Sequence, residues 1–338
     1  PRGCDRYVRR FSGNVFRNKD AVKIVEVGPR DGLQNEPQPI TIQDKLELIR
    51  MLESAGTSNI EVGAFVSPKW VPQMADSDRV LEDLLARHQQ NDCRARYSVL
   101  VPNLKGLEKA LQAPTVQMID EIAIFAAASE EFSKRNINST IEKSMERFRT
   151  VLEHVRQYND VHKNSNGQSP AIRVRGYVST VIACPYQGDI VPKQVAKVVE
   201  QMLDLGCYEI SLGDTIGVGT AGTTRPMLEE VLHVAKPSQL AMHCHDTYGQ
   251  ALTNILVGLE KDIFTIDSSI AGLGGCPYAK GASGNVATED VVYMLDGLGL
   301  STGIDLDALV DAGDYICQVL NRSTESKVAR ALRAKRVI

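Results

Sequence analysis

The sequence predicts a (β/α)8 barrel with additional helices at its C-terminal end, and two observations support this fold class. Eight short runs rich in β-branched residues recur along the 338-residue chain, and a segment with helical apolar spacing follows each run. Strands that alternate with helices are parallel and joined by crossovers. Because the units recur roughly every 25–40 residues, we favour a closed barrel over a doubly wound open sheet.

The eight runs are the predicted barrel strands, and helices are expected between them. The helical pattern is clearest at residues 41–56, where apolar residues stand three and four positions apart before Gly56 ends the pattern. Residues 191–206 repeat this pattern and end at Gly206. In chain order, the predicted strands are residues 22–28, 59–65, 96–102, 121–129, 172–180, 207–215, 240–247 and 263–272.

The segments outside the regular units also carry patterns. Residues 158–170 are polar and rich in turn formers, which predicts an exposed loop before the fifth strand. Three more helical patterns follow the eighth strand and are expected to cover the barrel or to form an oligomer contact; they lie near residues 289–298, 305–320 and 323–335. The expected organisation is an N-terminal arm (1–21), a catalytic barrel (22–300) and C-terminal helices packed on the barrel (301–338).

Composition and charge exclude several classes of protein. Hydrophobic residues make up 43% and charged residues 24%, as in ordinary globular proteins, and no apolar run is long enough to span a bilayer. The net charge of −4 provides no basic field for nucleic acid. The seven cysteines include no CxxC pair, which is typical of a reducing compartment. We therefore expect no nucleic-acid partner and no membrane partner.

The N-terminal arm has the composition of a targeting segment. It is rich in arginine and contains only two acidic residues, Asp5 and Asp20. Such a composition is what the end of a mitochondrial transit peptide would leave, so the mitochondrial matrix is the predicted location. A solvated arm on a cytoplasmic protein is the alternative.

Polar residues of catalytic type follow several predicted strands. In a (β/α)8 barrel, functional side chains lie at the carboxyl ends of the strands and in the loops that follow. In chain order, these residues are Arg30, Asp31, Gln34, Glu61, Arg175, Tyr177, Ser211, Asp214, Thr215, His243, His245, Asp246, Cys276 and Asn285. The candidate substrate-binding residues among them are Arg30, Gln34, Arg175, Tyr177, Ser211 and Thr215.

His243 and His245 form a candidate metal site. Side chains alternate between the two faces of a strand, so these histidines point the same way. Because a barrel closes on itself, Asp31 and Asn285 can converge on the same point from neighbouring strands. Two imidazoles, a carboxylate and an amide oxygen favour Mg²⁺ or Mn²⁺, with Zn²⁺ or Co²⁺ as possible substitutes.

The cysteines differ in what their surroundings predict. Cys276 lies in the glycine-rich stretch GLGGCPY, where its thiol is a candidate general acid or nucleophile. Cys244 alternates with the two histidines and is expected to point into packing. Buried, inert thiols are expected at Cys184, Cys207 and Cys317.

The stretch GVGTAG at residues 217–222 matches the glycine spacing of a dinucleotide fingerprint. That fingerprint belongs to the first unit of a βαβ fold, whereas this stretch follows the sixth predicted strand. We interpret it as a turn that shapes the mouth of the barrel or holds phosphate, and a nicotinamide site is the less favoured alternative.

Several long motifs resemble those of the 3-hydroxy-3-methylglutaryl-CoA lyase family. They are VEVGPRDGLQNE, FVSPKWVPQM, ASEEFSKRNIN, GCYEISLGDTIGVGT, HCHDTYGQA and SSIAGLGGCPYAKGASGN, and the similarity extends from about residue 22 to about residue 325. The resemblance implies a homodimeric lyase that cleaves this acyl-CoA to acetoacetate and acetyl-CoA, a reaction of ketogenesis and leucine degradation. It also implies a divalent cation held by Asp31, His243, His245 and Asn285.

The resemblance further implies catalytic roles for named residues. Arg30 matches an arginine that stabilises the thioester enolate. Cys276 matches a cysteine of the active-site loop, and Glu61 and Asp214 match two acidic residues of the site. Carbon–carbon cleavage requires removal of the C3 hydroxyl proton, stabilisation of the enolate and its reprotonation. His243 or a neighbouring metal-bound group is the expected base, so the predicted catalytic set also includes Asp31 and His243.

Three alternatives remain open at this point. Ala64 stands where many relatives carry a hydroxyl residue, and the extra room favours a longer 3-substituted glutaryl-CoA as a second substrate class. A metal hydrolase of the amidohydrolase kind also uses His-x-His in a barrel, but on the first strand, whereas here the pair lies on the seventh. A nicotinamide oxidoreductase would require the GVGTAG stretch to bind a dinucleotide.

Overall fold

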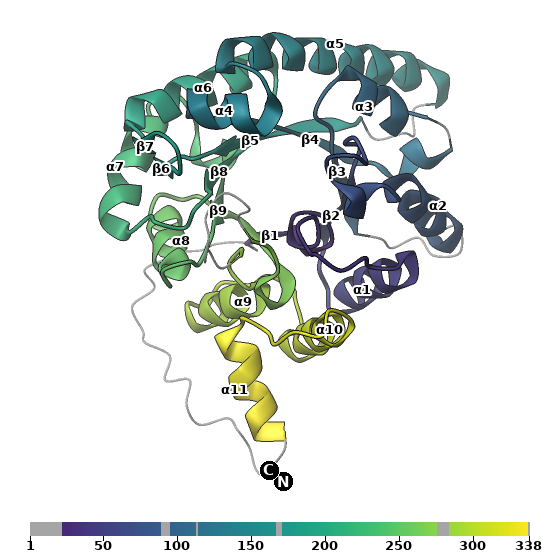
Figure 1. Cartoon of the computed structure of the whole chain (residues 1–338), viewed down its shortest axis with the longest axis vertical. Coiled ribbons are helices and arrows are strands. Elements are labelled where there is room, and N and C mark those ends of the chain that lie inside the picture. Colours follow the sequence, from purple (N-terminus) through teal and green to yellow (C-terminus); the bar gives the residue numbers. More distant parts are fainter. Residues whose placement is uncertain (1–21, 89–94, 113, 167–170, 276–283, 337–338) are drawn as a thin grey trace.

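The computed structural model describes residues 22–88, 95–112, 114–166, 171–275 and 284–336. Eight parallel strands close into a barrel in the order β1-β10-β9-β8-β5-β4-β3-β2, with helices outside it (Figure 1). This architecture confirms the predicted (β/α)8 class. The barrel strands are β1 (Lys23–Glu26), β2 (Asn59–Ala64), β3 (Arg96–Leu100), β4 (Glu121–Ala127), β5 (Arg173–Ser179), β8 (Glu209–Asp214), β9 (Leu240–Cys244) and β10 (Thr265–Ser268).

Helices connect successive barrel strands and surround them. They are α1 (Ile42–Ser54), α2 (Ser77–His88), α3 (Leu104–Ala110), α4 (Glu130–Ile137), α5 (Ile141–Asn166), α6 (Pro192–Leu205), α7 (Ala221–Val231), α8 (Ala251–Leu259), α9 (Thr288–Gly297), α10 (Leu306–Val319) and α11 (Lys327–Arg336). Short helical turns η1 (Gly28–Gly32), η2 (Pro72–Met74), η3 (Thr115–Met118), η4 (Pro237–Gln239) and η5 (Ile270–Gly272) lie in the connections.

The two helices with the clearest sequence patterns have well-defined ends. Helix α1 starts after Thr41, whose side chain accepts a hydrogen bond from the backbone of Asp44 and so satisfies a free donor of the first turn. Helix α6 starts at Pro192, which has no backbone donor to satisfy, and ends at Gly206 with φ of 107°. The starts of both helices and the end of α6 at Gly206 agree with the sequence prediction.

The predicted loop at residues 158–170 is wrong in its first part, because α5 continues to Asn166. Residues 158–166 are polar but contain neither glycine nor proline, the two residues that disfavour a helix most strongly, so they can continue α5. Tyr158 and His162 stack one helical turn apart at 3.9 Å between ring centroids. Asn159 bonds both backbone groups of Ile172 and fixes the approach to β5.

The last predicted helix also begins later than expected. Residue 327, not 323, opens α11, because the Ser326 side chain accepts a bond from the backbone of Ala329 and acts as the cap. The two-residue strands β6 (Ala183–Cys184) and β7 (Gly188–Asp189) form a small antiparallel sheet after β5, which the sequence analysis did not predict. Two residues are too few to show an alternating pattern.

Of the C-terminal helices, α9 and α10 lie outside the barrel on the side of β1, and α11 packs on α9 and extends away from the barrel (Figure 1). Helix α10 contacts α1 and η5, and α11 contacts α9. The backbone of Asp305 donates to the carbonyl of Ala55, and the backbone of Glu325 donates to that of Ala271 over 3.0 Å. These contacts support the connection that carries the last segment of the site.

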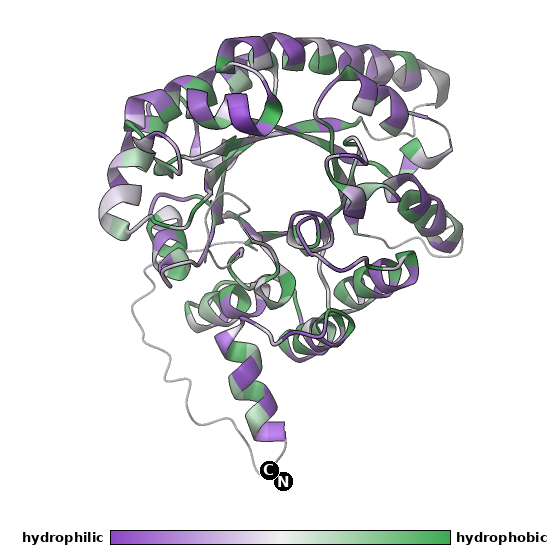
Figure 2. Ribbon diagram, viewed as in Figure 1, coloured by the Kyte–Doolittle hydropathy of each residue, from purple (hydrophilic) through white to green (hydrophobic). Residues whose placement is uncertain are grey.

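Burial separates two environments inside the molecule. Apolar side chains fill the layer between strands and helices, and the surrounding helices carry both hydrophilic and hydrophobic residues (Figure 2). The lumen of the barrel is different, since charged side chains of β2, β5, β8 and β10 are buried there, namely Glu61, Arg175, Glu209 and Asp267. Of the helices that the structure describes, none has the length and apolar character needed to cross a membrane.

Candidate active site

Three predicted ligands converge at the carboxyl end of the barrel. Asp31, His243 and His245 each present one ligand atom, and these atoms lie within 4.8 Å of one another. His243 and His245 share a face because β9 and its extension place them two residues apart. Asp31 reaches them from η1, directly after β1. The convergence expected from barrel closure is therefore present.

The geometry of η1 depends on two glycines. A Cβ atom at Gly28 would lie 2.6 Å from an oxygen of Glu26, and one at Gly32 would lie 2.7 Å from the hydroxyl of Ser269. Only glycine lets this turn pack so closely against β1 and the segment after β10. The close packing aims Asp31 across the mouth of the barrel.

Asn285 completes the predicted cluster. Its Nδ2 donates to Asp31 Oδ2 over 2.9 Å and to the carbonyl of Leu273 over 3.2 Å. Asn285 also bridges to His245 through the backbone. Gly274, at φ of 124°, leaves the room for this amide, since a Cβ there would lie 2.7 Å from Asn285 Nδ2. The amide therefore lies against the carboxylate of Asp31.

These residues fit a divalent cation. Nδ1 of His245 is buried without a hydrogen-bond partner among the described residues, an arrangement that coordination would relieve. Burial and the nearby His243 lower the pKa of His245 to about 4. Burial raises the pKa of Asp31, but Arg30 and the histidines outweigh it, so the pKa is lowered to about 2. Both groups are thus free of competing protons at neutral pH, and the nitrogen and oxygen donors suit Mg²⁺ or Mn²⁺.

Arg30 lies beside the candidate cation site. Its Nη1 donates to Asp31 Oδ1 over 2.6 Å, and its Nε donates to Glu61 Oε2 over 2.8 Å. Burial disfavours its charge, but Glu61 and Asp31 together raise the pKa of Arg30 above its ordinary value. A permanent, nearly buried positive charge therefore stands next to the ligand cluster.

Glu61 and Tyr177 form the wall next to Arg30. The Tyr177 hydroxyl donates to Glu61 Oε2 over 3.1 Å, and the Arg30 guanidinium lies 5.6 Å from the centroid of the tyrosine ring. Burial raises the pKa of Glu61, although Arg30 opposes the effect. Glu61 Oε1 is buried without a partner among the described residues, so one carboxylate oxygen is left for another molecule.

Asp214 ends β8, and the glycine-rich stretch 217–222 surrounds its carboxylate. The backbone of Gly219 donates to Asp214 Oδ2 over 2.8 Å, and a Cβ at Gly219 would lie 2.6 Å from that oxygen. Burial raises the pKa of Asp214, while backbone bonds from Gly219, Val218 and Gly217 oppose the rise. The glycines of this turn thus serve the approach to Asp214, which supports its interpretation as a turn at the mouth.

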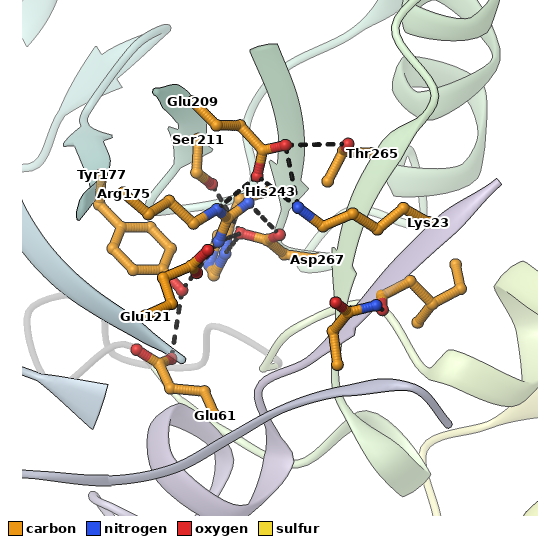
Figure 3. A network of polar contacts seen from close by, with 12 residues as sticks. Lys23, Glu61, Glu121, Arg175, Tyr177, Glu209, Ser211, His243, Thr265 and Asp267 are labelled. Carbon is orange, nitrogen blue, oxygen red and sulfur yellow. Dashed lines mark hydrogen bonds and ion pairs between the residues drawn. The ribbon is translucent and has the colours of Figure 1, made fainter. Parts of the chain in front are cut away.

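The remaining predicted substrate residues occupy two levels of the barrel. Gln34 lies at the cluster itself and donates to Asp31 Oδ1 over 2.8 Å. Thr215 accepts a bond from the backbone of Thr180 at the mouth. Arg175 and Ser211 lie inside the lumen, where both bind Asp267, Ser211 over 2.6 Å (Figure 3). Asp246 accepts bonds from the backbone of Ala251 and from Lys327.

Cys276 lies outside the described residues. The backbone carbonyl of Gly275, the residue before it, accepts a bond from Asn35 Nδ2 over 3.0 Å, which places this end of the segment near η1. The four other cysteines discussed above are free and buried as expected: Cys184, Cys207, Cys244 and Cys317. Burial raises the pKa of Cys207 to about 12 and that of Cys317 to about 11, so these thiols are unreactive near neutral pH.

The charged residues below the cluster were not predicted from the sequence. Asp267 on β10 lies in the apolar run IFTIDSSIAG, and Glu209 on β8 precedes Ser211 by one inward position. Both bind Arg175 in the lumen (Figure 3). An acidic residue on the inner face of a predicted buried strand is the signal that could have identified them.

A closed parallel barrel whose carboxyl-end mouth gathers a carboxylate, two imidazoles and an amide defines a barrel enzyme with a candidate divalent-cation site. A family profile described as HMGL-like matches residues 21–316. The 3-hydroxy-3-isohexenylglutaryl-CoA/hydroxy-methylglutaryl-CoA lyase of Pseudomonas aeruginosa is 55% identical over 314 residues, which are 93% of this chain and 98% of that protein. The mitochondrial hydroxymethylglutaryl-CoA lyase of Homo sapiens is 54% identical over 310 residues, 92% of this chain and 89% of that protein.

Solved structures give the same result. The crystal structure of hydroxymethylglutaryl-CoA lyase from Pseudomonas aeruginosa superposes with a TM-score of 0.83 at 55% identity and covers 93% of this chain and 98% of that one. An HMG-CoA lyase from Acinetobacter baumannii in complex with coenzyme A and 3-methylmalate superposes with a TM-score of 0.79 at 35% identity, over 92% of this chain and 95% of that one. The chain belongs to the hydroxymethylglutaryl-CoA lyase family.

Proposed function

We propose that this protein cleaves 3-hydroxy-3-methylglutaryl-CoA to acetoacetate and acetyl-CoA, a reaction of ketogenesis and leucine degradation. The single observation that carries the proposal is the junction of Arg30 and Asp31, whose side chains bond over 2.6 Å at the edge of the candidate cation site. A fixed positive charge thus adjoins a site for a Lewis acid. Family membership supports the same reaction.

The proposed reaction uses two parts of the site, the candidate cation ligands and Arg30. A divalent cation bound by Asp31, His243, His245 and Asn285 would polarise the C3 hydroxyl of the substrate and lower its pKa. His243, the base expected from the sequence, has no nitrogen free for this step when Nε2 binds the cation and Nδ1 donates to Asp267. Another group at the cluster is therefore proposed to take the hydroxyl proton. The C2–C3 bond breaks, C3 becomes the ketone carbon of acetoacetate, and the bonding electron pair passes to the thioester as an enolate.

Arg30 is proposed to stabilise that enolate oxygen. Its guanidinium is held by Glu61 and Asp31 on fixed elements, so little reorganisation accompanies the build-up of negative charge. The guanidinium of Arg30 lies over the aromatic ring of Tyr177. Glu61 and Asp214, each with one buried oxygen that has no partner among the described residues, are proposed to bind substrate or to relay protons.

The enolate must finally gain a proton at C2. Cys276 is the proposed donor, on the basis of the family resemblance and of its place in the glycine-rich stretch GLGGCPY. Gln34, Tyr177 and Thr215 are proposed contacts for the substrate at the mouth. For Arg175 and Ser211, a direct substrate contact would require exchange of their bonds to Asp267.

Product analysis tests the proposal. Purified enzyme with Mg²⁺ and 3-hydroxy-3-methylglutaryl-CoA is expected to release acetoacetate and acetyl-CoA in equal amounts. The Arg30→Met variant is expected to lose activity by about 10²–10³-fold, in line with the removal of one oxyanion donor. Release of free coenzyme A by hydrolysis of the thioester, without acetoacetate, would contradict the proposal and support a metal hydrolase instead.

A second substrate class is favoured by two observations. Ala64 is a small buried residue at the end of β2, and the Pseudomonas aeruginosa relative carries a name with both the isohexenyl and the methyl substrate. We therefore propose that a longer 3-substituted glutaryl-CoA is a slower second substrate. Comparison of kcat/KM for the two thioesters tests this ranking, and a strong preference for the longer one would reverse it.

The relatives and the family resemblance also support a proposal on the ligand and on the oligomeric state. We propose that the protein binds an acyl-CoA, since the Acinetobacter baumannii relative was solved with coenzyme A, and that it forms a homodimer, as the family resemblance implies. Sedimentation at twice the chain mass would support the dimer, and a monomer would contradict it.

We propose the mitochondrial matrix as the location of the protein, because residues 1–21 are rich in arginine and the human relative is named mitochondrial. A purely cytosolic tagged chain would contradict that location.

A further inference from the structure

The buried carboxylate of Asp267 contacts a candidate metal ligand from below. Asp267 lies on β10 directly beside His243 on β9, where the two residues are register partners. Its Oδ2 lies 3.2 Å from Nδ1 of His243 (Figure 3). The side chain of Asp267 is completely buried, so water does not compete for this contact.

Asp267 is itself held in place from the opposite side. Arg175 donates to Oδ1 over 2.6 Å and to Oδ2 over 3.1 Å, a bidentate pair, and the hydroxyl of Ser211 donates to Oδ2 over 2.6 Å. Asp267 is therefore a fixed anion that can only accept hydrogen bonds.

We propose that Asp267 is a positioning residue for His243, and this inference rests on the candidate cation site of the proposed function. A neutral imidazole has one donor nitrogen and one acceptor nitrogen. Since Asp267 only accepts, Nδ1 of His243 carries the proton, and the lone pair of Nε2 is left to face Asp31 and His245. The carboxylate fixes the ring orientation and raises the basicity of the ligand nitrogen.

The two histidines of the cluster are therefore not equivalent. Nδ1 of His245 is buried without a partner among the described residues, whereas Nδ1 of His243 has a dedicated anion. The lumen network from Arg175 to Asp267 thus supports one ligand of the pair. Its charged groups reach the mouth of the barrel through the contact of Asp267 with His243, and also through Tyr177, whose hydroxyl accepts from Arg175 and donates to Glu61.

A purely structural role is the competing explanation, because Asp267 also neutralises Arg175. Glu209 provides the matched control. It accepts a bond from Arg175 Nε over 2.8 Å from the other side and, among the described residues, makes no hydrogen bond or ion pair with His243. Both Asp267→Asn and Glu209→Gln remove one negative charge from Arg175, but only the first changes the partner of His243.

The test measures Mn²⁺ binding by the loss of the free Mn²⁺ paramagnetic resonance signal, without substrate. In Asp267→Asn, the amide oxygen is expected to remain with Arg175 and the amide NH₂ to face His243, which favours the wrong tautomer. We expect Mn²⁺ affinity to fall about 10–100-fold in Asp267→Asn and to stay unchanged in Glu209→Gln. Unchanged affinity in Asp267→Asn, or an equal loss in both variants, would overturn the proposal.

A second measurement needs no variant to fold. Nitrogen-15 NMR of the wild-type protein, metal-free and at a pH where the imidazoles are neutral, reports which nitrogen of His243 is protonated. We expect a protonated Nδ1 and an unprotonated Nε2, and the reverse tautomer would overturn the proposal. Neither readout depends on cleavage of the thioester, so a failure of the proposed function is distinguishable from a failure of this inference.

Discussion

Cys244 separates His243 and His245 in the chain, yet its side chain lies on the opposite face of the strand from theirs. The histidines face the candidate cation site, whereas Cys244 is buried in the apolar layer, where burial raises its pKa well above the usual value. Alternation along a strand is the whole cause of this difference. Adjacent substitutions can therefore separate metal binding from packing.

Loss of a residue that supports a metal ligand costs about 10–100-fold in metal affinity. We expect His245→Ala to weaken Mn²⁺ binding by more than this, because the ligand itself is removed. Cys244→Ala is the matched control and should keep wild-type Mn²⁺ affinity while losing about 1 kcal/mol of unfolding free energy. Titration calorimetry with Mn²⁺ and urea unfolding check the two effects. Equal Mn²⁺ affinity in wild type and His245→Ala would show that His245 is not a ligand.

For single residues, the sequence predicted the candidate cation ligands, because both their residue types and their positions after barrel strands suit metal binding. Asp31, His243, His245 and Asn285 follow strands that barrel closure brings together, and the structure brings them together. Asp267 was missed because one acidic residue in an apolar run has no local pattern. Its importance comes from Arg175, which lies 92 residues away in the chain.

The turn η5 and the start of α9 are held by two buried carboxylates. Both oxygens of Glu289 accept from the backbone of Ala271, at 3.1 and 3.0 Å, and Ala271 has the unfavourable φ of 56°. Glu26 accepts from the backbones of Gly28 and Ile270 and from the hydroxyl of Thr288. This segment leads from β10 towards Gly274 and Asn285, so its shape contributes to the site.

These carboxylates make stability depend on pH. Burial raises the pKa of Glu26 to about 7 and that of Glu289 to about 8, from an ordinary value of 4.5. Between 4.5 and about 8, the folded chain therefore binds more protons than the unfolded chain. The stabilisation is complete below the unfolded pKa and is lost as the pH rises through the folded pKa.

We expect Glu289→Gln, a permanently neutral variant, to flatten the fall in unfolding free energy between pH 5 and pH 8, as measured by urea denaturation. The difference in slope between wild type and variant should be at most about 1.4 kcal/mol per pH unit. Glu200→Gln on the exposed face of α6 should follow the wild-type profile. Parallel profiles for wild type and Glu289→Gln would contradict the raised pKa.

Elements were predictable where caps and periodicity agree. Helices α1 and α6 follow such signals closely. The extension of α5 was not predictable from polarity, because a helix that is exposed on most sides reads like a loop. The sheet of β6 and β7 was not predictable because each strand has only two residues.

On the scale of the whole molecule, the candidate cation site joins distant parts of the chain across the closure of the barrel. Asp31 follows β1, His243 and His245 belong to β9 and its extension, and Asn285 follows β10. The alternation of eight strands with helices was sufficient to predict this closure. The same connectivity means that a bound cation should stabilise the entire fold.

We expect Mn²⁺ at 100 times its Kd to add about 2.7 kcal/mol to the unfolding free energy, because a ligand that binds only the folded chain stabilises it by mass action. Thermal unfolding with and without Mn²⁺ checks this effect. His245→Ala should show no comparable shift. An unchanged melting temperature in the wild type would mean that the cluster does not bind Mn²⁺.

The central claim is that this fold uses a divalent cation at Asp31, His243, His245 and Asn285 to cleave 3-hydroxy-3-methylglutaryl-CoA. The most direct measurement is acetoacetate release from this thioester by the purified protein, after treatment with a chelator and again after addition of Mg²⁺ or Mn²⁺. We predict that release stops in the chelator and returns with the cation. Release at the full rate in the chelated, metal-free protein would contradict the claim.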